Sequence, residues 1–185
     1  MAAEVIILVG GSSSGKSQLA ENMTADLACQ NHLEVYYIAT GTIWDQEFAR
    51  RVEKHRLRRP AHWHTFEEPL DLNRSLQKIK DKKSVIMVDG IGTWIANHMY
   101  QEEGTFYWDD QQAQVLKNQT SRFIQAWEAM EGHLLIVADE VGMDVVPENA
   151  QARLFRDING QINQQLAQAA DRVYLVVCGL PVRIK

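Results

Sequence analysis

The sequence is poor in cysteine, carries no excess of positive charge and contains no long hydrophobic run. Two cysteines, Cys29 and Cys178, are too few for a disulfide framework or a thiolate metal site, which favours a reducing compartment. The N-terminal apolar run VIILVGG lacks the basic flank of a signal peptide and is far shorter than the roughly 20 residues of a membrane span. A formal net charge of −5 and a pI near 5.7 argue against a general nucleic-acid-binding protein. We therefore expect a cytoplasmic protein that neither spans a membrane nor binds nucleic acid.

The composition is that of an ordinary globular protein, with 45% hydrophobic and 23% charged residues in a chain of 185. No internal repeat or linker divides the chain, so we expect a single domain over residues 1–185. Five short apolar runs recur and are continuous rather than alternating, which is typical of strands buried on both faces of a parallel sheet. The predicted strands cover residues 4–9, 34–39, 84–89, 133–139 and 172–177.

Stretches of helical periodicity separate these runs. The clearest cover residues 150–170 and 109–130, and another runs from residue 45 to residue 58, before Pro60. Strands that alternate with helices predict an α/β fold, in which a mostly parallel sheet is flanked by helices with right-handed connections. The predicted core positions are Phe155, Ile158, Ile162 and Leu166 in the helix at 150–170, and Val115, Phe123 and Trp127 in the helix at 109–130.

The segment GGSSSGKS, residues 10–17, directly follows the first predicted strand and opens a predicted helix. It matches G-x-x-x-x-G-K-[ST], a pattern whose glycines let successive backbone N–H groups converge on a phosphate. Lys16 can neutralise β- and γ-phosphates, and the Ser17 hydroxyl can hold Mg²⁺. The alternative, a flexible turn with a chance lysine, would leave the order of strand, loop and helix unexplained.

A P-loop enzyme also needs a carboxylate at a strand end on the metal side of the site. Asp89 closes the run SVIMVD, and Asp139, followed by Glu140, closes HLLIVAD. Acids at strand ends also serve as simple turn residues. We favour Asp89 and keep Asp139 as the alternative.

Positive charge is concentrated in the basic segment RRVEKHRLRRPAHWHT, residues 50–65, which holds five arginines, one lysine and three histidines. On the predicted helix, His55 shares a side with the apolar Phe48 and Val52. This placement fits a half-buried structural histidine. It also fits an imidazole in a cleft, which nearby guanidinium groups would keep neutral and nucleophilic while they bind phosphate oxygens. Lys54 is the competing nucleophile, although an exposed lysine is mostly protonated.

Two weaker patterns follow in the same region. His62 and His64 have the spacing of a metal-ligand pair, but no further ligand set stands nearby, so we predict no zinc site. Trp63, between them, is expected to pack. Glu67 and Glu68 are expected in a turn, where a carboxylate could accept from the N1–H and 2-amino groups of guanine; a solvated acidic turn is the equal alternative.

Five segments in a fixed order carry a resemblance over nearly the whole chain. They are GGSSSGKS, YIATG, the basic segment, EVGMDVVPEN and the C-terminal FRDINGQINQQLAQAADRVYLVVCGLPVRIK. Together they resemble the bifunctional adenosylcobinamide kinase / adenosylcobinamide-phosphate guanylyltransferase family of cobalamin biosynthesis. The P-loop is common to many families, whereas EVGMDVVPEN and the histidine segment are far more specific. The resemblance implies a RecA-like P-loop fold, Mg²⁺, and a homo-oligomer that is typically a trimer with sites completed between subunits.

The resemblance also implies two reactions. In the first, ATP or GTP phosphorylates the hydroxyl of the corrinoid's aminopropanol arm. In the second, GTP gives its GMP to an enzyme histidine, releasing pyrophosphate, and the corrinoid phosphate then takes the GMP. The implied catalytic residues are His55 and Lys16, and the implied metal ligands are Ser17 and Asp89. The implied nucleotide contacts are Gly10, Gly11, Ser12, Ser13, Ser14, Gly15, Lys16, Ser17, Thr40, Gly41, Arg56, Leu57, Arg58, Arg59, Glu67 and Asp89.

This chain departs from the family's usual pattern at a few positions. Ser13 stands where an arginine is usual, Gly90 and Gly92 replace the first and last residues of "CLT", and Asp144 replaces a glycine. None of these changes removes a named catalytic group. Two other functions stay open: a P-loop kinase of another small alcohol, with a structural His55, and a nucleotide-binding regulatory switch.

Overall fold

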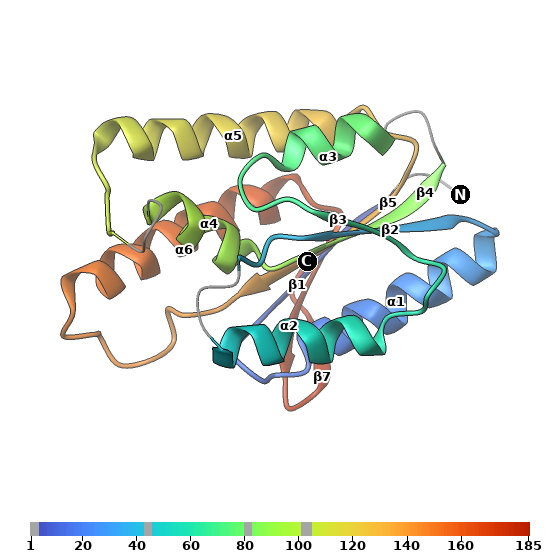
Figure 1. Ribbon diagram of the computed structural model, residues 1–185, viewed down its shortest axis with the longest axis horizontal. Helices are drawn as coiled ribbons and strands as arrows, with labels where there is room; N and C mark the ends of the chain where they lie inside the picture. Colours follow the sequence, from blue (N-terminus) through green and yellow to red (C-terminus); the bar gives the residue numbers. More distant parts are fainter. Residues whose placement is uncertain (1–3, 43–45, 80–82, 101–104) are drawn as a thin grey trace.

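The computed structural model describes residues 4–42, 46–79, 83–100 and 105–185, which form one α/β domain around a seven-stranded sheet (Figure 1). The strand order is β3-β2-β4-β5-β1-β6-β7, and every neighbouring pair is parallel except the antiparallel hairpin of β6 and β7. The strands are β1 (Glu4–Gly10), β2 (Glu34–Ala39), β3 (His64–Glu67), β4 (Ser84–Asp89), β5 (Gly132–Asp139), β6 (Arg172–Val177) and β7 (Leu180–Arg183). The helices are α1 (Lys16–Asn31), α2 (Gln46–Arg58), α3 (Leu72–Ile79), α4 (Ile91–Met99), α5 (Asp110–Glu128) and α6 (Ala150–Ala169).

All five strands predicted from the sequence are confirmed, with β1 and β5 each one residue longer than expected. The sequence does not predict β3 or β7. Both lie at the edges of the sheet, and their side chains are largely exposed. An edge strand needs no continuous apolar run, so the criterion that found the central strands passes over these two.

Helices cover both faces of the sheet. In Figure 1, α1 and α2 lie on one face, and α3, α4, α5 and α6 lie on the other. Neighbouring residues of one strand contact opposite layers: Leu8 and Tyr37 belong to the core cluster with α1, whereas Ile7 and Ile38 belong to the cluster with α3 to α6. This burial on both sides explains why the central strands carry continuous rather than alternating apolar runs.

The long helix α6 agrees with its predicted pattern. Ile158, Ile162 and Leu166 are buried, and Phe155 packs partly buried against the same core. In α2 the predicted end before Pro60 is also confirmed, since the helix ends at Arg58.

The core stripe of α5 differs from the prediction at one position. Phe123 and Trp127 are buried as expected, but the side chain of Val115 is 37% exposed and Leu116 is buried in its place. Residues 116, 120, 123 and 127 follow the spacing of one helical face, and Val115 is turned about 100° away from that face.

The carboxyl ends of the parallel strands meet at one edge of the sheet, where ligands usually bind in such folds. The P-loop follows β1, and Glu67, Asp89 and Asp139 end β3, β4 and β5. Because β5 lies between β1 and β4, Asp139 comes between the P-loop and Asp89. The strand order therefore gathers residues that lie far apart in the sequence.

Candidate active site

The loop between β1 and α1 has the backbone of a phosphate-binding loop. Gly15 is the N-cap of α1 and has a φ of 91°, a left-handed conformation that favours glycine. Glycine brings no side-chain oxygen over the first N–H groups of the helix, so these groups and the helix dipole are available to an anion. Helix α1 begins at Lys16, which confirms the predicted order of strand, loop and helix.

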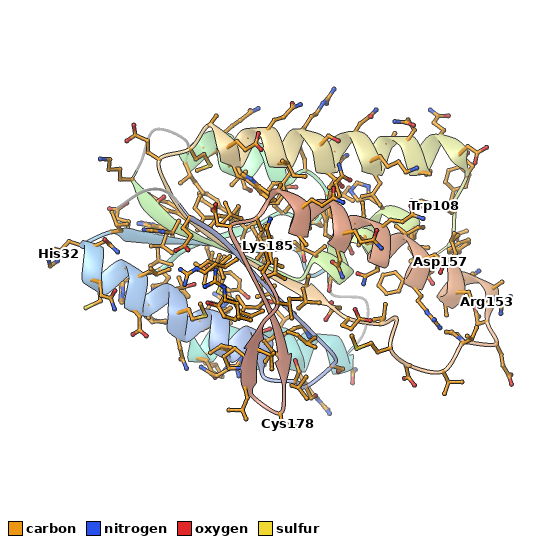
Figure 2. The ribbon with its side chains drawn as sticks, turned by 180° about the vertical axis from the view of Figure 1, so that it is seen from behind. His32, Trp108, Arg153, Asp157, Cys178 and Lys185 are labelled. Carbon is orange, nitrogen blue, oxygen red and sulfur yellow. The ribbon has the colours of Figure 1, made fainter. Side chains whose placement is uncertain are left out.

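The hairpin of β6 and β7 packs against this loop. The backbone N–H of Gly179 donates to the carbonyl of Ser14 at 2.8 Å, and a Cβ on Gly15 would lie 3.0 Å from the Gly179 Cα. Figure 2 shows Cys178 at the tip of this hairpin, and its thiol is free and exposed, as is that of Cys29. The contact joins Ser14, near the start of the chain, to Gly179, near its end, and no local pattern in the sequence predicts it.

Lys16 is buried against a carboxylate at the mouth of the loop. Its Nζ lies 2.8 Å from Asp139 Oδ1 and donates to the carbonyl of Gly11 at 3.0 Å. Asp139 is itself fixed at the end of β5, because its carbonyl accepts from the side-chain amides of Asn159 and Asn163 on α6, at 2.7 and 2.9 Å. This chain of contacts holds the ammonium beside the N-terminus of α1.

The two residues predicted to bind the metal lie together. Ser17 Oγ donates to Asp89 Oδ1 at 3.2 Å, and the hydroxyl of Tyr37 donates to Asp89 Oδ2 at 2.5 Å. Burial and the negative charge of Asp89 raise the pKa of Tyr37 well above its usual value, so the phenol stays protonated and remains a donor. A hydroxyl and a carboxylate are oxygen ligands of the kind that Mg²⁺ takes together with water, so these residues fit the predicted ion. The metal-binding role of Asp89 stays a prediction.

Arg56, Arg58 and Arg59, at the end of α2 and just beyond it, line the same cleft as the P-loop. Arg58 Nη2 lies 3.4 Å from Glu21 Oε1 on α1. The guanidinium of Arg59 stacks over the ring of Tyr37, with its Cζ 3.7 Å from the ring centroid. The basic segment is therefore joined to α1 and β2 by named contacts.

His55 lies on α2 directly before Arg56, but its side chain, like those of Lys54 and Phe48, lies outside the described residues. Its role as nucleophile stays a prediction. Leu57, predicted to contact the nucleotide with its neighbours, is 79% exposed and is not part of the cleft lining. Consecutive helix residues point about 100° apart, so a run of four cannot face one ligand with every side chain.

The residues predicted to contact the nucleotide beyond β2 divide into two kinds. Gly41 lines the cleft. Thr40 is buried, and its hydroxyl donates to the carbonyls of Gly90 at 2.7 Å and Asp89 at 3.1 Å, so its side chain holds two strand ends together. Asn97 on α4, which the sequence did not single out, donates to the Thr40 carbonyl at 2.7 Å.

Glu67 lines the cleft as the last residue of β3, which corrects its predicted place in a turn. It pairs with Ala39 in the parallel register of β2 and β3. The turn begins at Glu68, whose buried carboxylate accepts from the backbone N–H of Asp71 at 3.0 Å. Trp63 is buried in the core cluster of α1, which confirms that it packs.

These groups line one open cleft of about 1210 Å³. The P-loop, Lys16, Ser17, Asp89 and Asp139 lie in it together with Glu67 and the three arginines. Of the predicted contacts, Gly10, Gly11, Thr40 and Leu57 are not in its lining. Besides Asp139, the lining residues that the sequence did not single out as nucleotide contacts are Gln18, Tyr37, Ala39, Thr42, Val52, Thr65, Pro69, Gly90, Thr93 and Val137.

The sequence as a whole matches a family model described as cobinamide kinase / cobinamide phosphate guanyltransferase over residues 6–184. The chain belongs to this family. It is 38% identical over 185 residues to the bifunctional adenosylcobalamin biosynthesis protein CobU of Escherichia coli strain K12, with 98% of this chain and 99% of that protein covered. It is 35% identical over 179 residues to the protein CobP of the same description from Pseudomonas aeruginosa, with 97% and 96% covered. The protein is thus a transferase of a cobalamin biosynthesis family, with a P-loop for a nucleotide.

Solved structures support the fold alone. The flagellar accessory protein FlaH of Methanocaldococcus jannaschii has a TM-score of 0.51 at 16% identity and covers 94% of this chain and 71% of that one. A KaiC-like protein of the archaeon Pyrococcus horikoshii has a TM-score of 0.51 at 11% identity, with 94% and 71% covered. The predicted P-loop fold with a mostly parallel sheet is confirmed.

Within residues 4–42, 46–79, 83–100 and 105–185, no group of three or more His, Cys, Asp and Glu side chains could hold a metal ion. In the same part of the chain, no helix is long and apolar enough to cross a membrane.

Proposed function

We propose that the protein phosphorylates adenosylcobinamide and then transfers GMP from GTP to adenosylcobinamide phosphate, through a covalent intermediate on His55. The observation that supports this most is that the P-loop with Lys16 lines the same cleft as the arginines that follow His55, at the end of α2 and just beyond it. The family to which the chain belongs is described by both activities, a kinase and a guanyltransferase.

In the kinase step, the acceptor hydroxyl oxygen attacks the γ-phosphorus of the triphosphate, and the bond from that phosphorus to the β,γ-bridging oxygen breaks. The nucleoside diphosphate leaves, and the hydroxyl proton passes to solvent. Lys16 neutralises charge on the β- and γ-phosphates, and the N–H groups at the start of α1 bind their oxygens. Mg²⁺, held by Ser17 and Asp89, would add its charge to that neutralisation. The protein's contribution is chiefly positioning and electrostatic stabilisation, since it forms no covalent bond in this step.

In the transfer step, a ring nitrogen of His55 attacks the α-phosphorus of GTP, a P–N bond forms, and pyrophosphate leaves. A phosphate oxygen of the phosphorylated corrinoid then attacks the same phosphorus, and the P–N bond breaks to release the histidine and adenosylcobinamide-GDP. Arg56, Arg58 and Arg59 offer forked donors for the phosphate oxygens. Glu67, at the end of β3, would accept from the two donors on the edge of guanine.

We include in this proposal a cytoplasmic location and a homo-oligomer, a trimer by resemblance to the family. Leu57, two residues after the proposed nucleophile on α2, is exposed and offers an apolar side chain for contact with a second subunit. Light scattering of the purified protein would give its subunit count.

The experiment that tests the proposed function uses GTP labelled on the α-phosphate. After incubation and denaturation, the protein should carry the label and gain the mass of one GMP. GTP labelled on the γ-phosphate is the matched control and should leave the protein unlabelled, because that phosphate departs in pyrophosphate. A kinase of another alcohol, or a regulatory switch, would form no adduct with either label, and that result would refute the transfer step.

A further inference from the structure

Tyr37 lies between the side of the cleft that holds Asp89 and the side that holds Arg59. It is a β2 residue with a side chain only 2% exposed, and it pairs with Met87 in the parallel register of β2 and β4. Residues two apart on a strand point to the same face, so the side chain of Asp89 follows Met87 on the face that α1 covers. The phenol ring reaches along this face, and its hydroxyl meets the carboxylate of Asp89.

Asp89 is held by hydroxyl groups on both oxygens. Ser17 donates to Oδ1 at 3.2 Å and Tyr37 donates to Oδ2 at 2.5 Å. Since Tyr37 is fixed in the core cluster of α1, its hydroxyl restricts the rotation of the carboxylate. A group that donates a hydrogen bond to a metal ligand in this way orients the ligand and tunes its affinity for the ion.

The face of the same ring supports Arg59. The guanidinium lies 3.7 Å over the ring centroid, the geometry of a cation–π contact. Within the described part of the chain, the buried Nε of Arg59 has no hydrogen-bond partner. A buried donor without a partner is costly, and a phosphate or nucleotide oxygen in the cleft would satisfy it. Stacking fixes the plane of the guanidinium and leaves its N–H groups to a ligand.

We propose that Tyr37 is a positioning residue for both reactions, with its hydroxyl orienting Asp89 for the metal and its ring holding Arg59 for GTP. The second half rests on the proposed function, whereas the first requires only that the P-loop binds a nucleotide with Mg²⁺. Tyr37 contacts no reacting atom; it acts through Asp89 and Arg59. One buried side chain thereby couples the metal side of the cleft to its basic side.

The hydroxyl is tested with Tyr37→Phe, which keeps the ring. Binding of a non-hydrolysable GTP analogue is measured by calorimetry over a range of Mg²⁺ concentrations, so that no turnover is needed. We expect the half-saturating Mg²⁺ concentration to rise about tenfold or more, the range for loss of an outer partner of a metal ligand. The double variant Tyr37→Phe/Asp89→Asn should be no worse than Asp89→Asn alone, because the hydroxyl acts only through the carboxylate.

The matched control is Tyr36→Phe. Tyr36 is the neighbouring buried tyrosine, but it belongs to the core cluster on the opposite face, and its hydroxyl donates to Glu34 at 2.7 Å. This variant should keep the wild-type Mg²⁺ dependence. Equal Mg²⁺ dependence in Tyr37→Phe and wild type, or additive effects in the double variant, would overturn the role of the hydroxyl.

The ring is tested in a double-mutant cycle that starts from Tyr37→Phe, so that the hydroxyl is absent from every variant. Relative to Tyr37→Phe, both Tyr37→Leu and Tyr37→Phe/Arg59→Ala should raise the GTP concentration that half-saturates adduct formation, and Tyr37→Leu/Arg59→Ala should show little further loss. Additive losses would overturn the role of the ring. If wild type forms no GMP adduct, the proposed transfer fails and the ring loses its assigned purpose, but the Mg²⁺ titration of Tyr37→Phe still decides the hydroxyl on its own. Thermal unfolding of each variant confirms that the comparison concerns folded protein.

Discussion

The side chains of Lys16 and Asp139 form an ion pair of 2.8 Å at the carboxyl ends of the neighbouring strands β1 and β5. Ser17, the next residue of α1, contacts Asp89 on β4 instead. Adjacent residues of one helix therefore distinguish two strand-end acids that the sequence alone leaves as alternatives. The division suggests different roles, with Asp139 holding the lysine and Asp89 serving the metal.

Asp89→Asn should weaken the binding of Mg²⁺ more than Asp139→Asn does. The substitution removes the negative charge of the Asp89 carboxylate beside the Ser17 hydroxyl, and this charge attracts the ion. The rate of phosphoryl transfer is measured against Mg²⁺ concentration at fixed triphosphate. The Mg²⁺ concentration that gives half the maximal rate should rise by about tenfold in Asp89→Asn and much less in Asp139→Asn. The reverse ranking would assign the metal to the end of β5.

Lys16→Ala should lose phosphoryl transfer by about a hundredfold to a thousandfold, the loss typical of removing a preorganised donor to the developing charge. The fixed positive charge beside the N-terminus of α1 disappears with the side chain. Lys117→Ala, at an exposed position on α5, is the control and should retain the wild-type rate. Turnover of Lys16→Ala at the wild-type rate would refute the P-loop role of this lysine.

Leu116→Ala should destabilise the protein by about 2–5 kcal/mol, because it removes a buried side chain from the core face of α5. Val115→Ala, one position earlier and partly exposed, should change the free energy of unfolding by less than about 0.5 kcal/mol. Urea unfolding of the two variants measures both values. Similar losses at the two positions would mean that the helix packs in another phase.

Much of the fold could be predicted from local pattern, because the central strands are buried on both faces and their apolar runs are unbroken. The phase of α5 was missed at Val115 because two apolar residues stand side by side, and periodicity alone does not choose between them. β3 and β7 could not be found in this way, since these edge strands are largely exposed and carry no continuous buried run; they owe their place to pairing with β2 and β6.

The candidate site was predictable where a motif carries the chemistry and unpredictable where tertiary contacts do. GGSSSGKS announces Lys16 and Ser17 by spacing. Tyr37, in contrast, sits inside an apolar strand and looks like core in the sequence, and only the register of β2 and β4 brings its hydroxyl to Asp89. The support of the P-loop by Gly179 depends likewise on the order of strands around β1.

Glu67→Gln should relax the preference for GTP over ATP in adduct formation. An amide offers a donor where guanine presents two donors that need acceptors, so part of the discrimination is lost. The ratio of kcat/KM for the two nucleotides should fall by about tenfold or more. Glu53→Gln, at an exposed position on α2, is the control and should leave the ratio unchanged. An unchanged ratio in Glu67→Gln would assign Glu67 a structural role at the end of β3.

His55→Ala should separate the two activities. Transfer of GMP through a covalent intermediate needs the imidazole, so the adduct, the guanylyl transfer and the exchange of labelled pyrophosphate into GTP should all be abolished. Phosphorylation of the corrinoid depends on Lys16, Mg²⁺ and positioning, so it should largely survive. His62→Ala, an exposed histidine of the same basic segment, is the matched control and should retain both activities.

The chemistry of the adduct adds an independent test of the same residue. A phosphoramidate on histidine is labile to acid and stable to base, and tandem mass spectrometry of base-treated wild type should place the GMP on His55. Attachment to Lys54 would keep the reaction class and change the nucleophile. Pyrophosphate exchange that persists in His55→Ala would show that the imidazole is not the group that attacks GTP. The arginines of the basic segment would then serve to bind the triphosphate without a covalent step.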